Sequence, residues 1–134
     1  MIKTEPGRSI NFVTAFFRAA GWAAVVLIAV LSLVPGEARP HVVASSQLEH
    51  VAAYTVAASS LAFGYFGFGN LIALATLLPI YAAVLELLQF WVPGRTARVI
   101  DVVAGTAGSW IGISTIVLLH WMTTAPSQSS SRER

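Results

Sequence analysis

Two long stretches without any charged residue constrain this chain more than any other feature of its sequence. No Asp, Glu, Lys or Arg occurs from His50 to Leu85, and none occurs from Val102 to Gln128. About 20 apolar residues are enough for a helix to cross the hydrocarbon core of a membrane, so the first stretch can cross it twice. With 56% hydrophobic and 10% charged residues, the composition also departs from that of a soluble domain. The sequence therefore predicts an all-α integral membrane protein.

Breaks in the apolar pattern divide the chain into four expected spans, which form a bundle of antiparallel transmembrane helices. Proline and glycine in PGEARP, GYFGFGN and VPGR mark the connections. Pro79 falls inside the third span, where neighbouring groups must satisfy the carbonyl that it frees. A polar segment, 1–11, precedes the spans, and a Ser-rich segment, 123–134, has the composition of a disordered tail. The expected spans are residues 12–34, 47–66, 71–91 and 98–122.

The distribution of basic residues predicts the orientation of these spans. An even number of crossings places both termini on one side of the membrane. The basic residues of that side are Lys3, Arg8, Arg18, Arg132 and Arg134, and those of the opposite side are Arg39, Arg95 and Arg98. By the positive-inside rule, both termini lie in the cytoplasm. No small-x-small cleavage site precedes Pro35, so we expect the first span to remain a helix rather than to be removed as a secretory signal.

Polar residues at the span ends converge on the non-cytoplasmic face of such a bundle. Antiparallel helices bring together the start of the second span, the end of the third and the start of the fourth. Glu86 and Gln89 are three residues apart, so they share a helix face, and Arg98 and Asp101 are related in the same way. The expected polar site consists of His50, Tyr54, Glu86, Gln89, Arg95, Arg98 and Asp101.

Glu86 is the most informative residue of this set. It lies about 10 Å inside the end of its span, judged from Pro93 and a helical rise of about 1.5 Å per residue. A charged side chain at that depth costs a few kcal/mol, so Glu86 should be protonated, paired with Arg95 or Arg98, or open to a wet cavity. Two interpretations stay open: an ion-pair cluster that clamps the helical hairpins together, or a pocket for a headgroup, a proton or a substrate.

Nothing in the sequence predicts a metal site or a cofactor. Glu49 and His50 are adjacent and would point about 100° apart on a helix, so they cannot easily hold one ion, and HExxH is absent. His41 and His120 are expected at the membrane interface, and no serine stands in a sequence that marks a nucleophile. The chain has no cysteine, and its net charge of +2 is too small to indicate nucleic acid.

Small residues recur at helical spacing in the fourth span. Ala104, Gly108 and Gly112 follow one another at intervals of four, with Gly105 alongside. Such spacing lets another helix approach closely, which drives association inside a membrane. We expect packing within the bundle, against the third helix, which would bring Asp101 toward Glu86. The alternative is homodimerisation through the same residues.

Four motifs stand in the order and spacing found in VanZ-like membrane proteins, and the chain resembles that family across its whole four-helix region. The motifs are SLVPG, HVAAY (50–54), ELLQFWVPGR (86–95) and DVVAGTAGSWIG (101–112). The resemblance implies a bacterial inner-membrane protein. The family's polar positions carry over to His50, Tyr54, Glu86, Gln89, Arg95 and Asp101.

The chain also departs from the family pattern. Ser46 and Gln47 stand where the family commonly has an Asp-Lys pair, and Gly105 stands where it commonly has Asn. These departures put in doubt whether the site keeps the family's chemistry. The founding member of the family is linked to low-level resistance to the glycopeptide teicoplanin, but the resemblance implies no particular reaction.

Together these features predict recognition of a membrane lipid, either an anionic lipid or a lipid-linked cell-envelope precursor such as a polyisoprenyl phosphate. Guanidinium groups match phosphate with paired donors, so Arg95 and Arg98 would hold the headgroup while Glu86 and Asp101 orient them. One alternative is a lipid-modifying enzyme with His50 or Glu86 as general acid or base. The other is an assembly protein in which the cluster only clamps the bundle.

Overall fold

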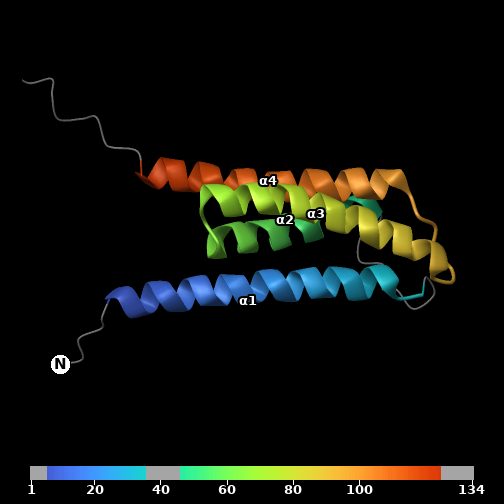
Figure 1. Ribbon diagram of the computed structural model, residues 1–134, viewed down its shortest axis with the longest axis horizontal. Helices are drawn as coiled ribbons and strands as arrows, with labels where there is room; N and C mark the ends of the chain where they lie inside the picture. The colour runs from blue at the N-terminus through green and yellow to red at the C-terminus, as the bar shows by residue number, and fades with distance from the viewer. Residues whose placement is uncertain (1–5, 36–45, 125–134) are drawn as a thin grey trace, which may run out of the picture.

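The computed structural model describes residues 6–35 and 46–124, and it is helical throughout these ranges apart from the connections. Figure 1 shows that successive helices alternate in direction, so that the start of α1 and the end of α4 lie at the same end of the bundle. No strand occurs in the two described ranges, which confirms the prediction of an all-α chain. The elements are α1 (Pro6–Leu33), α2 (Ser46–Gly64), α3 (Phe68–Leu88), the short 3₁₀ helix η2 (Gln89–Trp91) and α4 (Val99–Thr124).

Each helix overlaps one predicted span, with shifted ends. Helix α1 begins at Pro6, well before residue 12, because proline has no N–H group to leave unsatisfied at the first helical position. Helix α4 continues to Thr124, into the segment predicted as a tail. Between η2 and α4 the chain turns at Gly94, whose φ of 72° suits glycine because it has no β-carbon. Residues 1–5 and 36–45 and the rest of the predicted tail, 125–134, lie outside the described residues.

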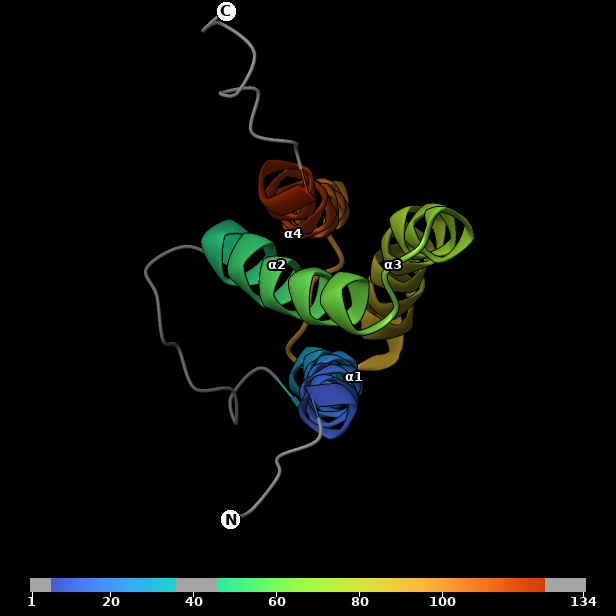
Figure 2. The ribbon, with the colours of Figure 1, turned by 90° about the vertical axis from the view of Figure 1, so that its left-hand side faces the viewer.

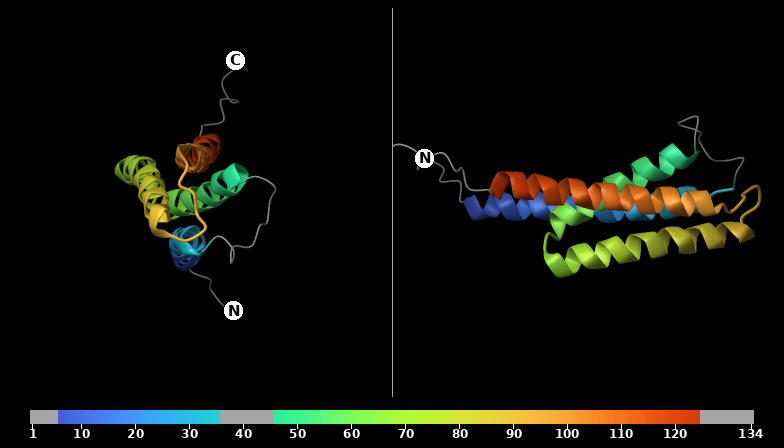
Figure 3. Two further views of the ribbon diagram at one scale, coloured as in Figure 1. Left: turned by 90° about the vertical axis from the view of Figure 1, so that its right-hand side faces the viewer. Right: turned by 90° about the horizontal axis from the view of Figure 1, so that it is seen from above.

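Within residues 6–35 and 46–124, three segments are long and apolar enough to cross a membrane: Asn11–Leu33, Phe68–Trp91 and Val99–Thr124. Helix α2 is not among them, because it carries Glu49 and His50 near its start and several hydroxyl residues farther along. Figure 2 shows α2 between α1 and α4, with α3 at its side, and Figure 3 shows it inclined to α4. Ala57, Ala58 and Ala62 are fully buried, so α2 faces its neighbours more than the surroundings of the bundle.

The closest helix contact joins α2 to α4 through the small residues of α4. A β-carbon added at Gly108 would lie 2.4 Å from the backbone oxygen of Val51, and one added at Gly112 would lie 2.6 Å from that of Thr55. Hydroxyl groups bridge the same surface: Thr55 Oγ1 donates to the carbonyl of Gly108 at 3.1 Å, and Ser59 Oγ donates to that of Gly112 at 3.3 Å. These glycines therefore face α2, whereas the sequence led us to expect α3.

Gly105 is the exception, because it faces two helices. Its added β-carbon would lie 3.1 Å from both Tyr54 of α2 and Ala82 of α3. Ala104 is buried beside it. The start of α4 is thus enclosed by both neighbouring helices, which places Asp101, one turn earlier, beside the start of α2 and the end of α3.

Helix α3 is tied to its neighbours by two side-chain hydrogen bonds. Pro79 has no N–H, so the carbonyl of Ala75, one turn earlier, loses its helical donor. The indole Nε1 of Trp110 in α4 donates to that carbonyl at 3.1 Å. On the other side, Tyr81 Oη donates to the carbonyl of Val25 in α1 at 2.7 Å. The Trp110 bond satisfies a carbonyl that an apolar environment would otherwise leave unpaired, and the Tyr81 bond satisfies the tyrosine hydroxyl.

Alanine in place of Gly108 is expected to lower the free energy of unfolding by about 1–3 kcal/mol, since the new β-carbon would force α2 away from α4. Gly69→Ala is the matched control, because nothing lies within 4 Å of its added β-carbon and it also sits in a helix. Thermal unfolding of the two purified variants in detergent measures the difference. Equal melting temperatures would show that α2 and α4 are not in close contact.

Candidate functional site

Buried polar side chains gather at the end of the bundle where α2 and α4 begin and α3 ends, the right-hand end in Figure 1. Glu86 in the last turn of α3 is 6% exposed, Gln89 at the start of η2 is 4% exposed, and Asp101 in the first turn of α4 is 5% exposed. Carboxylates are rarely buried to this extent without partners, because removing them from water is costly. Their partners therefore define what the site can do.

Arg98 connects the two buried acids in different ways. Its backbone N–H donates to Oε1 of Glu86. Its guanidinium donates to Asp101, from Nε to Oδ2 at 3.3 Å and from Nη2 to Oδ1 at 3.2 Å. The Arg98 side chain remains 45% exposed, while that of Asp101 is buried. Glu86 is thus met by the backbone of Arg98, and the charge of Arg98 is directed at Asp101.

Arg95 points to a different part of the bundle. Its Nε donates to the carbonyl of Val34 at 3.1 Å, and its Nη2 donates to the carbonyl of Leu31. The last carbonyls of a helix have no partner within that helix, and a basic side chain can supply one. Arg95 therefore caps the end of α1 and fixes the α3–α4 connection against it. The sequence placed Arg95 in the phosphate site, but could not show this contact.

His50 contributes an imidazole from the first turns of α2. Its Nδ1 lies 2.9 Å from the carbonyl oxygen of Ser46. A carbonyl only accepts, so Nδ1 carries the proton, and in the neutral ring Nε2 keeps a free lone pair. The ring lies nearly parallel to that of Tyr54, with 6.5 Å between centroids and 14° between planes. His50 is therefore held in one orientation and one tautomer.

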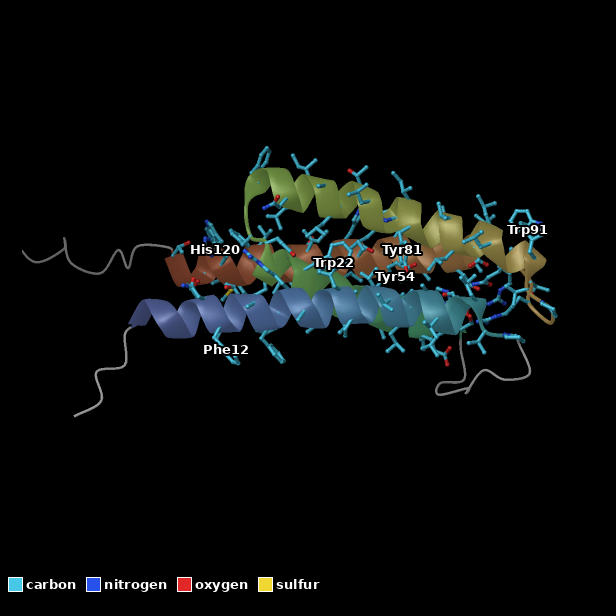
Figure 4. All side chains as sticks on the ribbon, turned by 60° about the horizontal axis from the view of Figure 1, so that its bottom comes forward. Phe12, Trp22, Tyr54, Tyr81, Trp91 and His120 are labelled. Atoms are coloured by element: carbon cyan, nitrogen blue, oxygen red, sulfur yellow. The ribbon has the colours of Figure 1, made fainter. Side chains whose placement is uncertain are left out.

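Tyr54 lies deeper in the bundle than the other predicted site residues. It is almost completely buried, and its ring centroid lies 6.4 Å from that of Tyr81. Figure 4 shows the two tyrosines next to each other in the middle of the bundle, whereas Trp91 lies at the end. Tyr54 therefore forms the floor beneath His50, and it also contacts Gly105 of α4.

Three of the predicted site residues come together from three helices. His50, Glu86 and Asp101 each offer a nitrogen or oxygen atom, and these atoms all lie within 4.8 Å of one another. Arg98 bonds to both acids of this group, whereas Arg95 bonds to the end of α1. Gln89 is buried at the start of η2. From the sequence we considered only the adjacent pair of Glu49 and His50 as metal ligands, and we expected no metal site there. The sequence contains no spacing motif for the triad, because each helix contributes a single residue.

A helical bundle with membrane-capable helices and acids buried at one end defines a helical membrane protein with an internal polar site. The chain belongs to the VanZ/LLP1 family, whose model it matches over residues 10–122. That match confirms the resemblance seen in the motifs and includes every residue of the predicted polar site. Comparison with curated proteins and with solved structures finds no match.

Arg95→Ala is expected to reduce the free energy of unfolding by about 1–3 kcal/mol, because two carbonyls at the end of α1 would lose charged donors. Thr96→Ala, in the same connection and exposed, serves as the control and should melt like the wild type. Thermal unfolding in detergent again provides the measurement. If both variants melt alike, the contact between Arg95 and α1 does not contribute to stability.

Proposed function

We propose that this chain is a bacterial inner-membrane protein that crosses the membrane four times and recognises a phosphate-bearing lipid at its non-cytoplasmic face. The ligand class is an anionic lipid or a lipid-linked cell-envelope precursor. One observation carries the proposal: the guanidinium of Arg98 is half exposed, yet it is held in place by the buried carboxylate of Asp101. An oriented, accessible guanidinium at the end of a membrane bundle is suited to bind phosphate.

The hydrogen bonds of Arg98 leave donors for a ligand. The bonds to Asp101 use Nε and Nη2, so the N–H groups of Nη1 remain for phosphate oxygens. Arg98 also directly precedes Val99, the first residue of α4. The start of a helix attracts anions, because its first N–H groups and its dipole are both positive. Phosphate bound there would meet both the guanidinium and the helix end.

The surroundings of Arg98 favour a lipid over a soluble anion. Trp91 is 77% exposed, and Phe90, Val99 and Ile100 are also exposed on the same connection and the adjoining turn. Tryptophan favours the level of the lipid headgroups, where its ring is partly in hydrocarbon and its N–H is solvated. Figure 4 places Trp91 at the end of the bundle that holds the site. Acyl or isoprenyl chains could therefore lie along these side chains while the headgroup reaches Arg98.

The orientation rests on the distribution of charge at the two ends. At the end opposite the site, Arg18 donates from Nε to the carbonyl of Gly64 at 2.7 Å, and its guanidinium lies over the ring of Tyr65. Arg18 shares that end with the start of α1, where Lys3 and Arg8 precede it in the sequence. The larger number of basic residues there supports a cytoplasmic location for both termini, which puts the Arg98 end outside.

Binding of a polyisoprenyl phosphate to the purified protein tests the lipid proposal. Arg98→Ala should weaken binding at least tenfold, since a charge-assisted contact to phosphate is worth about 1.5–3 kcal/mol. Arg98→Lys should lose part of the affinity, because an ammonium group retains charge but not the paired donors. Microscale thermophoresis in detergent, with the uncharged polyisoprenol as a second ligand, separates recognition of phosphate from association of the chain.

Arg18→Ala is the matched control for that experiment, because it removes a guanidinium from the opposite end of the bundle. It should bind the phosphate lipid like the wild type once both are shown to be folded. If Arg98→Ala binds as tightly as the control, the lipid proposal is wrong. Lower thermal stability of Arg98→Ala in that case would leave clamping of the bundle as the role of Arg98.

Cysteine labelling in membranes tests the four crossings. The natural chain has no cysteine, so single-cysteine variants at residues 47, 70 and 96 give unambiguous labels. A membrane-impermeant maleimide added to intact spheroplasts should label residues 47 and 96 and spare residue 70, which is exposed near the start of α3. Labelling of 47 and 96 from opposite sides would contradict the topology, whatever the result with lipid.

A further inference from the structure

We propose that His50, Glu86 and Asp101 form a binding site for a divalent transition-metal cation, with zinc as the best-matched ion. The three residues come from α2, α3 and α4, and their candidate ligand atoms lie within 4.8 Å of one another. Ligands of one zinc ion lie about 2.0–2.2 Å from the metal and hence roughly 3–4 Å from each other. Inward movement of the side chains by about 1 Å would complete the site.

The hydrogen bond of His50 prepares its ring for a metal. Histidines that bind metals usually donate their other ring N–H to a carbonyl or carboxylate, which fixes the tautomer. The Nδ1 of His50 has such a partner in the carbonyl of Ser46, at 2.9 Å. Nε2 is therefore the nitrogen that carries the lone pair in the neutral ring. The nearly parallel ring of Tyr54 further limits the rotation of the imidazole.

The two carboxylates are also positioned by contacts outside the triad. Glu86 accepts from the backbone N–H of Arg98 through Oε1, so Oε2 remains for another partner. Asp101 is oriented by the guanidinium of Arg98. Each of the three residues thus has an outer contact that fixes its direction, the arrangement that supports ligands in metal sites.

Electrostatics gives a reason for a cation at this position. Two carboxylates that are both about 95% buried and lie this close repel each other strongly when ionised, because little water screens them. The charge of Arg98 is directed at Asp101 and is half exposed. A divalent ion between Glu86, Asp101 and His50 would remove the repulsion and use the imidazole lone pair. A proton shared between Glu86 and Asp101 would remove the repulsion as well, but it would leave the lone pair of the His50 imidazole without a partner.

The donor set selects the class of ion. One imidazole and two carboxylates suit zinc and, more weakly, manganese, whereas magnesium prefers oxygen ligands alone. Three protein ligands also leave a coordination position open, as in zinc sites that accept a further ligand. The inference does not depend on lipid binding, because no residue of the triad is required to contact the lipid.

Metal content of the untagged, detergent-purified protein tests the inference. After dialysis against micromolar ZnCl₂ and removal of free metal, elemental analysis should find about one zinc per chain. His50→Gln and Glu86→Gln keep the size of the side chain and a polar group, and each should weaken zinc affinity at least 100-fold, since even loss of an outer-shell contact costs about 10–100-fold. Calorimetric titrations with Zn²⁺, Mn²⁺ and Mg²⁺ should give that order of affinity.

His120→Gln is the matched control, because His120 lies at the opposite end of the bundle, where its ring contacts Phe66. It should bind zinc like the wild type, and zinc should raise the melting temperature of both but not that of His50→Gln. Arg98→Ala keeps the backbone N–H to Glu86 but removes the outer contact of Asp101, so its zinc affinity should fall by about 10–100-fold, less than that of His50→Gln. Less than 0.1 zinc per chain in the wild type, or equal affinity in His50→Gln and His120→Gln, would overturn the proposal.

Discussion

The close contact between α2 and α4 is the constraint on which the rest of the structure depends. At Gly108 and Gly112 the two backbones approach so closely that no β-carbon fits, and hydroxyl groups of α2 bond to the exposed carbonyls. Water drives no hydrophobic association between helices inside a membrane, so small residues and hydrogen bonds must supply the attraction. The same contact fixes the register of the two helices. As a result His50, at the start of α2, faces Asp101, at the start of α4.

A second requirement, that polar groups be satisfied within the protein, explains the remaining ties between helices. Pro79 frees a carbonyl in α3, and Trp110 of α4 donates to it. The end of α1 exposes carbonyls, and Arg95 donates to them. Within the described residues, every buried side-chain nitrogen and oxygen has a hydrogen-bond partner. The acids at the end of the bundle are therefore held by the same contacts that join the helices, so a ligand would meet a largely preformed site.

The sequence predicted the helices and the neighbourhood of the polar residues, because both follow from length and order. Charge-free stretches indicate where the helices lie. Because successive helices run in opposite directions, residues distant in the sequence, such as His50 and Glu86, come to the same end of the bundle. The sequence could not assign separate contacts to Arg95 and Arg98. Two arginines three residues apart differ only in the groups that they contact in the folded protein. It also assigned the glycines of α4 to α3, because small-residue spacing identifies a contact face without naming the partner helix. The topology of the crossings and the ligand remain proposals.

The two arginines illustrate how one short connection can serve both stability and binding. Arg95 is directed inward, to the backbone of α1, and its donors satisfy carbonyls there. Arg98 is directed outward, and its guanidinium is bonded to Asp101. A cation bound to Asp101 would draw electron density from that carboxylate and weaken its ion pair with the guanidinium of Arg98. The cation would also add positive charge near the proposed phosphate position. If both proposals hold, metal and lipid would therefore influence each other's affinity by the same factor, as linkage requires, and Asp101 is the residue through which that coupling would pass.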